Sequence, residues 1–137
     1  MSNDLAVLLG ELTPEERAHW EALQSERIVF QRCQSCGHPW TPPRSECPHC
    51  LCAAWDWESA SGRGELISWV VYHRAFHPTF NELVPYAVAL VELAEGPRML
   101  TALAEDSELG REIRCGAPVA LSVVERGGVK IAQARLV

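Results

Sequence analysis

Two Cys-x-x-Cys pairs constrain the fold of this chain more than any other feature of its sequence. The pairs are Cys33 with Cys36 and Cys47 with Cys50, and a short proline-rich stretch separates them. Two such knuckles supply the four thiolates that a tetrahedral Zn²⁺ ion needs, from two sides. Because protein groups fill all four positions, no position remains for water or substrate. We therefore expect a structural zinc ion.

Other uses of these cysteines agree less well with the sequence. A redox dithiol of the thioredoxin type usually has one pair beside a βαβ pattern, and this chain has two pairs without that pattern. His38, His49 and Cys52 are close enough in sequence to replace a thiolate. The regular spacing of the two knuckles already closes the site, so we expect Cys52 to be a small buried side chain and both histidines to be solvated.

The sequence carries no signal that would direct it to a membrane or out of the cell. No apolar run approaches the length of a membrane span. The first residues are acidic where a signal peptide would be basic, and their apolar run is short. Six cysteines without an export signal indicate a reducing compartment. We therefore expect a cytoplasmic protein with free thiols rather than disulfides.

The segment before the cysteines, residues 1–27, predicts one helix. Thr13 is a good N-cap, Pro14 suits the first helical position, and Glu16 completes a capping box. The helix should run to about Glu26. Its apolar stripe is narrow, so it can either pack onto its own domain or dock on another protein. The sequence does not favour one of these two interpretations over the other.

Strand patterns predict two β units after this helix. Short strands beside the cysteines indicate a rubredoxin-like zinc ribbon over about residues 28–58. A boundary rich in glycine and serine opens the second unit, residues 59–137. Five strands, with a break after the third, suit a small closed OB-fold barrel, and an SH3-like barrel is the main alternative. The expected strands of this barrel are 65–73, 86–93, 98–104, 118–125 and 129–136.

Alternation along two of these strands predicts which side chains fill the barrel. Val88 and Leu90 on one strand, and Val119, Leu121 and Val123 on another, should point into one core. Apolar residues in the N-terminal third are a different case, because a ribbon of about 30 residues can hardly cover them. We expect them to form an interface with another protein. These residues are Leu5, Leu8, Leu9, Leu12, Trp20 and Leu23.

Charge and motif content disfavour two classes of function. The formal net charge is −6 and Lys130 is the only lysine, which disfavours nucleic acid as a partner. A single-stranded nucleic-acid binder remains the less favoured alternative, because zinc ribbons and OB folds both serve that use. No Ser/His/Asp or Cys/His motif links His73, His77, Asp106 and Cys115. We therefore do not expect an enzyme that acts alone.

Short motifs occur in a fixed order over residues 28–124. They are Arg32-Cys33-x-x-Cys36-Gly37, Pro42-Pro43-Arg44, Cys47-Pro48-x-Cys50, Ser61-Gly62-Arg63-Gly64, Tyr72-His73-Arg74, Pro85-Tyr86-x-Val88-Ala89-Leu90-Val91-Glu92-Leu93 and Gly116-x-Pro118-Val119. With these motifs the chain resembles the zinc-ribbon/OB-fold proteins associated with acyl-CoA enzymes. One departure is Leu51, which stands where that family commonly has a glycine.

The resemblance implies an accessory role in lipid metabolism rather than catalysis. Members of the family are generally subunits beside thiolase-fold enzymes, which include ketoacyl-CoA thiolases, acetyltransferases and sterol-carrier-type aldolases. Others are fused to or paired with hot-dog enoyl-CoA hydratases. The resemblance thus implies a heteromeric complex in which this chain stabilises a thiolase-like catalytic subunit and helps to bind the acyl-CoA. A hydratase partner is the alternative.

Three arginines could contact the phosphates of such a coenzyme A thioester, because a guanidinium group can grip a phosphate through two hydrogen bonds. Arg63, Arg74 and Arg98 lie in or near the first three expected barrel strands. Tyr72 or Phe76 could provide a stacking platform for the adenine ring. The simpler interpretation is a set of separate, solvated arginines, since the strand register decides whether they converge.

Overall fold

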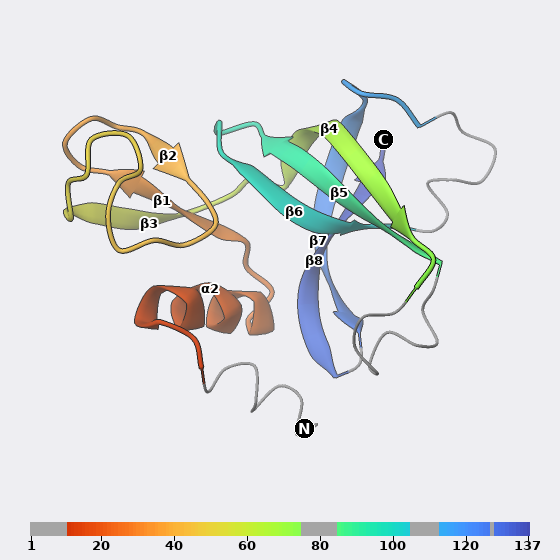
Figure 1. Cartoon of the computed structure of the whole chain (residues 1–137), viewed down its shortest axis with the longest axis horizontal. Helices are drawn as coiled ribbons and strands as arrows, with labels where there is room; N and C mark the ends of the chain where they lie inside the picture. The colour runs from red at the N-terminus through yellow and green to blue at the C-terminus, as the bar shows by residue number, and fades with distance from the viewer. Residues whose placement is uncertain (1–10, 75–84, 105–112, 127) are drawn as a thin grey trace.

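In the part of the chain that the structure describes, the fold is mainly β, with one helix ahead of two sheets (Figure 1). The computed structural model describes residues 11–74, 85–104, 113–126 and 128–137. Strands β1 to β3 form a three-stranded sheet in the order β2-β1-β3, and the other five form a closed barrel in the order β4-β5-β6-β8-β7. The described elements are α2 (Pro14–Gln24), β1 (Val29–Cys33), β2 (Pro39–Trp40), β3 (Trp55–Ser59), β4 (Arg63–Tyr72), β5 (Tyr86–Leu93), β6 (Arg98–Leu103), β7 (Pro118–Arg126) and β8 (Val129–Leu136).

This architecture confirms the predicted fold class of a zinc ribbon followed by an OB-fold barrel. The small sheet carries the cysteine pairs and lies beside the barrel in Figure 1. A division of the chain into residues 1–27, 28–58 and 59–137 stays a prediction. Leu5, Leu8, Leu9, Phe76, His77 and Asp106 lie outside the described residues.

Helix α2 begins as the sequence predicts and ends slightly earlier. The Thr13 side chain accepts a hydrogen bond from the Glu16 amide, and the Glu16 side chain accepts one from the Thr13 amide, so both halves of the capping box are present. The helix ends at Gln24 instead of Glu26. Glu26 has a φ of 63°, a left-handed conformation that cannot continue a right-handed helix.

The apolar side of α2 packs on the barrel of its own chain. Leu23 is buried in the main hydrophobic core, and Trp20 packs against that core. The Gln24 side chain donates a hydrogen bond to the Lys130 carbonyl over 3.1 Å and accepts one from the Lys130 amide over 3.2 Å. Gln24 therefore pairs with β8 much as a neighbouring strand would. The expectation that Trp20 and Leu23 lie exposed as an interface is wrong, because they pack in a core that the barrel shares with Ile28 and Phe30 at the start of the ribbon.

Helix α2 lies where the barrel is least complete. Strands β6 and β8 run parallel and pair only through Ala102 with Gln133 and Leu103 with Ala134. The earlier residues of β6 have no described strand partner on that side. The helix contacts β8 directly, so a segment that precedes the ribbon in sequence helps to close the barrel that follows it.

The barrel core differs from the predicted core in the register of β5. Ala89 and Val91 are fully buried, while Val88 and Leu90 are half-buried on the opposite side of the strand. The prediction for Val88 and Leu90 is therefore wrong by one residue. Both faces of β5 are apolar, so alternation of apolar with polar residues could not identify the inner face. The β7 prediction fares better: Val119 is buried, and Leu121 and Val123 pack partly against the core.

Candidate metal centre

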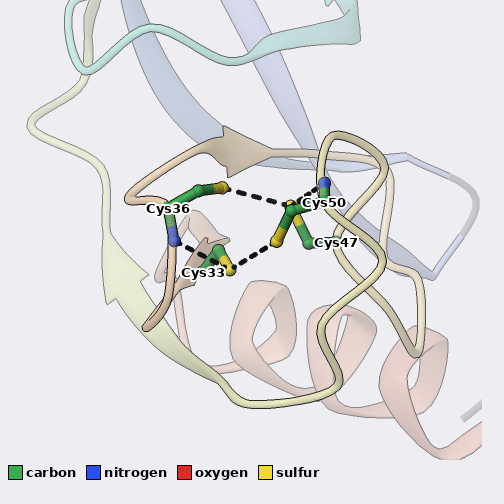
Figure 2. Close-up of side chains that lie close together, drawn as sticks. All are labelled: Cys33, Cys36, Cys47 and Cys50. Carbon is green, nitrogen blue, oxygen red and sulfur yellow. Dashed lines mark hydrogen bonds between the residues drawn. The ribbon is translucent and has the colours of Figure 1, made fainter.

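Four cysteine sulfurs meet where the two knuckles face each other (Figure 2). All four ligand atoms lie within 4.8 Å of one another. The Sγ atoms of Cys33 and Cys50 are 3.5 Å apart, and those of Cys36 and Cys47 are 3.7 Å apart. In a tetrahedron with Zn–S bonds of about 2.3 Å, neighbouring sulfurs are about 3.8 Å apart. The donor set and its dimensions therefore fit a metal ion.

The two knuckles share one backbone design. In the first, the amides of Ser35 and Cys36 point at the Cys33 sulfur, at 3.3 and 3.4 Å. In the second, the amides of His49 and Cys50 point at the Cys47 sulfur, at 3.4 and 3.5 Å. These N–H groups donate to sulfur and favour the thiolate over the thiol, since a hydrogen bond to the charged form stabilises it.

Gly37 and Leu51 occupy the same place in the two knuckles. The Gly37 amide donates to the Cys33 carbonyl over 3.1 Å, and the Leu51 amide donates to the Cys47 carbonyl over 2.9 Å. Both residues have a positive φ, 78° for Gly37 and 66° for Leu51. Leu51 is also 71% exposed, so its side chain gains little from packing. The departure of this sequence from the family's glycine therefore places a leucine in a strained conformation.

Replacing Leu51 with glycine should stabilise the ribbon. Relief of the left-handed strain, roughly 1 kcal/mol, outweighs the larger chain entropy that glycine loses on folding, so we expect a net gain of about 0.5 kcal/mol. Denaturant unfolding of the zinc-loaded protein measures this change in the free energy of unfolding. The Leu51→Ala variant is the matched control, since it keeps a Cβ atom and should gain nothing. Gly37→Ala should lose about 1 kcal/mol, because it creates the same strain in the first knuckle. Equal stability of the leucine and glycine forms would contradict the assigned strain.

The protonation of the four thiols explains why the cluster needs a cation. The hydrogen bond from the Cys36 backbone is the main cause that lowers the pKa of Cys33 to about 6, against the opposing effect of burial. A hydrogen bond from the Cys52 backbone lowers the pKa of Cys50. The Cys33 sulfur, burial and the other two sulfurs raise it, and together they bring it to about 12. Four thiolates so close repel one another unless a cation balances them. Protons therefore compete with the metal ion, and its affinity should rise with pH.

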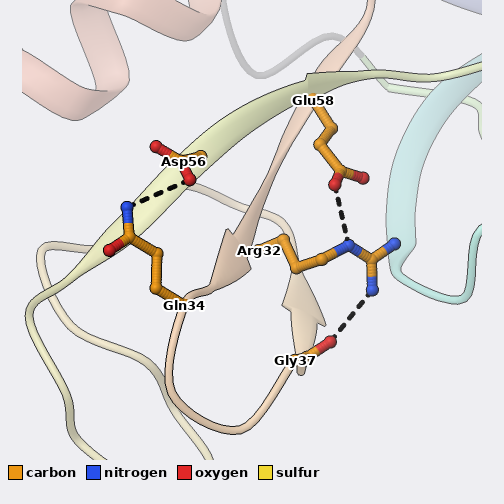
Figure 3. Close-up of polar contacts among 5 residues, drawn as sticks. All are labelled: Arg32, Gln34, Gly37, Asp56 and Glu58. Atoms are coloured by element: carbon orange, nitrogen blue, oxygen red, sulfur yellow. Dashed lines mark hydrogen bonds and ion pairs between the residues drawn. The ribbon is translucent and has the colours of Figure 1, made fainter.

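Side chains on neighbouring strands brace the first knuckle (Figure 3). Arg32 donates from Nε to Glu58 on β3 over 3.0 Å, and from Nη1 to the Gly37 carbonyl over 2.9 Å. Gln34 donates to Asp56 over 3.0 Å. These bonds connect the knuckle that holds Cys33 and Cys36 to the outer strand of the small sheet, so they fix the direction in which both sulfurs point.

The other candidate ligands stay outside the cluster. Among the described residues, the group whose ligand atoms come close enough to hold a metal ion comprises only the four predicted cysteines. The rings of His38 and His49 stack on each other, with centroids 5.4 Å apart. The Cys52 sulfur accepts a hydrogen bond from the Ala54 amide and is partly buried.

The structure separates the residues proposed to contact coenzyme A. Arg63 begins β4 and Tyr72 ends it, which places them roughly 30 Å apart along the extended strand. Arg74 follows Tyr72 and is exposed. Tyr72 stacks on Tyr86, with ring centroids 5.2 Å apart. Arg98 begins β6 and pairs with Glu92 over 3.2 Å. Arg74 and Tyr72 therefore lie at one end of β4, while Arg63 lies at the other.

Arg98 instead lines a cavity together with residues of the ribbon, a proximity that the sequence analysis did not predict. A cavity of about 320 Å³ between ribbon and barrel is lined by Arg98, Arg44, His38 and Trp40, together with several prolines. The Trp40 indole N–H is buried and donates to no described group. Every one of these polar side chains can donate a hydrogen bond, so the cavity suits an anion. The sequence signal was the Pro42-Pro43-Arg44 motif, but only the fold places Arg44 beside Arg98.

The outer face of β4, β5 and β6 is largely apolar. Register pairs Val88 with Val70 on β4 and with Ala102 on β6, and it pairs Leu90 with Leu100, so these side chains form adjoining rows on the outside of the barrel. Val70 is 54% exposed and Leu100 is 69% exposed. We call these five residues the outer apolar face. In the described part of the chain, the helix is too short to cross a membrane.

Comparisons with known proteins match both parts of this arrangement. The ChsH2 rubredoxin-like zinc ribbon domain matches residues 20–56, and the ChsH2 C-terminal OB-fold domain matches residues 57–124. A DUF35 domain-containing scaffold protein of Methanothermobacter thermautotrophicus is 34% identical over 97 residues, which cover 66% of this chain and 71% of that protein. A probable enoyl-CoA hydratase alpha subunit of Thermomonospora curvata is 41% identical over 111 residues, or 80% of this chain. The chain spans only about a third (34%) of that relative's length.

Solved structures agree with these matches. A chain of an Ltp2-ChsH2(DUF35) aldolase superposes with a TM-score of 0.77 at 35% identity, covering 92% of this chain and 97% of that one. A DUF35 protein of unknown function from Sulfolobus solfataricus superposes with a TM-score of 0.64 at 14% identity, which supports the fold alone. The chain thus belongs to the ChsH2/DUF35 family, which joins a rubredoxin-like zinc ribbon to an OB-fold domain.

Proposed function

We propose that this chain is a non-catalytic accessory subunit that binds and stabilises a thiolase-fold enzyme acting on acyl-CoA thioesters. The enzyme would be a ketoacyl-CoA thiolase, an acetyltransferase or a sterol-carrier-type aldolase. The observation that carries the proposal is the match, over almost the whole of both chains, to a chain of the Ltp2-ChsH2(DUF35) aldolase. The relatives named as scaffold proteins support a role in assembly rather than chemistry.

The surface chemistry supports an accessory role. The described candidates for a nucleophile or a base, Cys115 and His73, are both exposed, and no hydrogen bond to a described acid or base activates either one. The outer apolar face offers a docking surface, since contiguous exposed apolar side chains usually mark an interface. We therefore propose this face, in place of Trp20 and Leu23, as the interface with the partner protein.

Two further parts of the proposal concern ligands. We propose that Cys33, Cys36, Cys47 and Cys50 hold one structural Zn²⁺ ion, which fixes the ribbon and supplies no reacting group. We also propose that the cavity with Arg44 and Arg98 contacts the phosphates of a coenzyme A thioester held mainly by the partner. Arg63, Tyr72, Arg74 and Phe76 stay predicted contacts.

A hot-dog enoyl-CoA hydratase is the second candidate partner. The Thermomonospora curvata relative carries the name of a hydratase alpha subunit, and its similarity covers 80% of this chain. Because the similar region is only about a third of that protein, the name can describe a part outside the similar region. A co-purification experiment separates the two partners.

Co-expression tests the accessory role directly. The tagged chain, expressed with a thiolase-like protein from the same genome, should co-purify with it, and turnover of acyl-CoA should require both chains. Leu100→Glu should abolish co-purification, because it places a charge in the outer apolar face. Leu51→Glu is the matched control, since Leu51 is equally exposed but lies on the ribbon. A thiolase-like enzyme that turns over equally well alone would contradict the proposal, and co-purification with a hydratase only would favour the second candidate.

A further inference from the structure

A second cavity, of about 260 Å³, lies between α2 and the barrel. It occupies the region where β6 and β8 are not paired and where the helix replaces a neighbouring strand. Its walls come from α2, β5, β6, β8 and the end of β7, and they include Trp20, Met99 and Ile131. A water molecule takes roughly 30 Å³ of liquid and a methylene group somewhat less, so this volume holds a ligand of about ten non-hydrogen atoms.

Two buried polar atoms of the residues that line this cavity have no hydrogen-bond partner. Thr101 is only 4% exposed, and neither its Oγ1 atom nor the Nδ1 atom of His19 has a partner among the described residues. Burial lowers the pKa of the His19 imidazole, against a smaller raising effect of the Val29 backbone. At neutral pH the ring is therefore uncharged, and the unpartnered Nδ1 can accept a hydrogen bond when the proton is on Nε2. Buried groups are rarely left unpaired, because each one loses its hydrogen bonds to water without a replacement.

Arg126 contributes a positive charge to the same cavity. It ends β7, lines the cavity and is half-buried. No described residue forms an ion pair or a hydrogen bond with its guanidinium group. The lining thus combines apolar walls, one cation, one acceptor and one hydroxyl group that can both donate and accept.

We propose that this cavity binds a short aliphatic hydroxy acid of about ten non-hydrogen atoms. Its carboxylate pairs with Arg126, and its hydrocarbon chain packs on Trp20 and Met99. Its hydroxyl group donates to His19 Nδ1 and accepts from the Thr101 hydroxyl, which satisfies both unpaired groups at once. The site is separate from the cavity beside the ribbon, although its lining shares Val88, Leu100 and Ala102 with the outer apolar face.

Titration calorimetry of the full zinc-loaded chain tests the site, with 3-hydroxyoctanoate as the probe. We expect saturable binding at one site per chain. Octanoate, which lacks the hydroxyl group, should bind about tenfold more weakly, because it leaves Thr101 and His19 unpaired. Octane-1,3-diol, which lacks the carboxylate, should also bind about tenfold more weakly, since Arg126 loses its partner.

Variants assign the contacts. Thr101→Val keeps the shape of the side chain and should remove most of the preference for 3-hydroxyoctanoate over octanoate. Arg126→Gln should weaken both acids about tenfold. Arg98→Gln, in the other cavity, is the matched control and should change neither. In each variant an unchanged melting curve verifies the fold, and a ligand-induced shift of the Trp20 indole N–H resonance verifies the location.

Three results would overturn the proposal. One is the absence of saturable binding of either acid at millimolar concentration, which would mean that the cavity holds water only. Another is an unchanged preference between the two acids in a folded Thr101→Val protein. The third is binding that shifts the resonances of Val70 and Leu90, which belong to the outer apolar face but not to the cavity lining, without shifting that of Trp20. Val88, Leu100 and Ala102 line this cavity and also belong to the outer apolar face, so the two proposals share these residues. Their failures stay distinguishable, because calorimetry of the chain alone reports on the ligand and co-purification reports on the partner.

Discussion

Replacing Cys47 with serine should release the metal ion and unfold the ribbon. The Cys47 side chain is fully buried, and its sulfur lies among the other three. A hydroxyl group is a poor ligand for Zn²⁺, so the site loses one of four bonds and its closed tetrahedron. The ribbon has little else to hold it, because its own core comprises Cys33, Trp40 and Cys47, with Cys52 and Trp55 at the edge. A structural zinc site of this kind supplies folding energy that so small a core cannot replace.

Elemental analysis and tryptophan fluorescence measure this outcome. The zinc content should fall from about one ion per chain to near zero, and the fluorescence of Trp40 and Trp55 should shift to that of solvated indole. Cys52→Ser and Cys115→Ser are matched controls that remove a sulfur outside the cluster, and both should keep the full metal content. Full retention of zinc in the Cys47→Ser protein would overturn the ligand assignment.

Replacing Val91 with aspartate should unfold the barrel, whereas the same change at Leu90 should be tolerated. Val91 is fully buried in the main core, and its Cγ1 atom lies within 2.8 Å of the place where a Cβ on Gly64 would stand. The site has no room for water, and a carboxylate there would be an unpaired buried charge. We expect the free energy of unfolding to fall by more than about 4 kcal/mol, which is a large share of the stability of a small domain.

Leu90→Asp is the matched control, since it makes the same change one residue away. Leu90 lies on the outer apolar face beside Leu100, where solvent reaches a carboxylate. The Leu90→Asp change should lower the free energy of unfolding by about 1 kcal/mol, and the protein should still melt cooperatively. Thermal unfolding followed by circular dichroism distinguishes the two variants. A folded Val91→Asp protein beside an unfolded Leu90→Asp protein would mean that the opposite face of β5 is the inner one.

Helix α2, the cysteine cluster and strand β5 show what the sequence could and could not predict. Local signals were sufficient for the helix start at Thr13, for the cysteine cluster and for the order of the strands, because capping, ligand spacing and turn residues act over a few positions. The inner face of β5 could not be identified, since both of its faces are apolar. The family resemblance supplied the barrel type but not its register.

Sequence patterns could not predict contacts between segments that are far apart in the sequence. Arg44 and Arg98 line one cavity, and His19 and Thr101 line another, although the two residues of each pair are far apart in the sequence. The same is true of α2, whose narrow apolar stripe fits packing on its own barrel as well as docking on another protein. Only the tertiary fold decides between these two, by placing Leu23 in the core of the barrel.

The contact between Gln24 and Lys130 joins residues 106 positions apart and has a consequence for synthesis on the ribosome. The outermost cysteines of the ribbon are only 17 positions apart, so the ribbon can fold and load its metal ion as soon as it leaves the exit tunnel. Helix α2 emerges earlier but cannot dock until β8, near the other end of this sequence, has been made. The nascent chain therefore carries a finished ribbon while Leu23 is still uncovered. During that interval a chaperone would find its binding site on the helix and on Ile28 and Phe30, which also remain uncovered until the barrel forms.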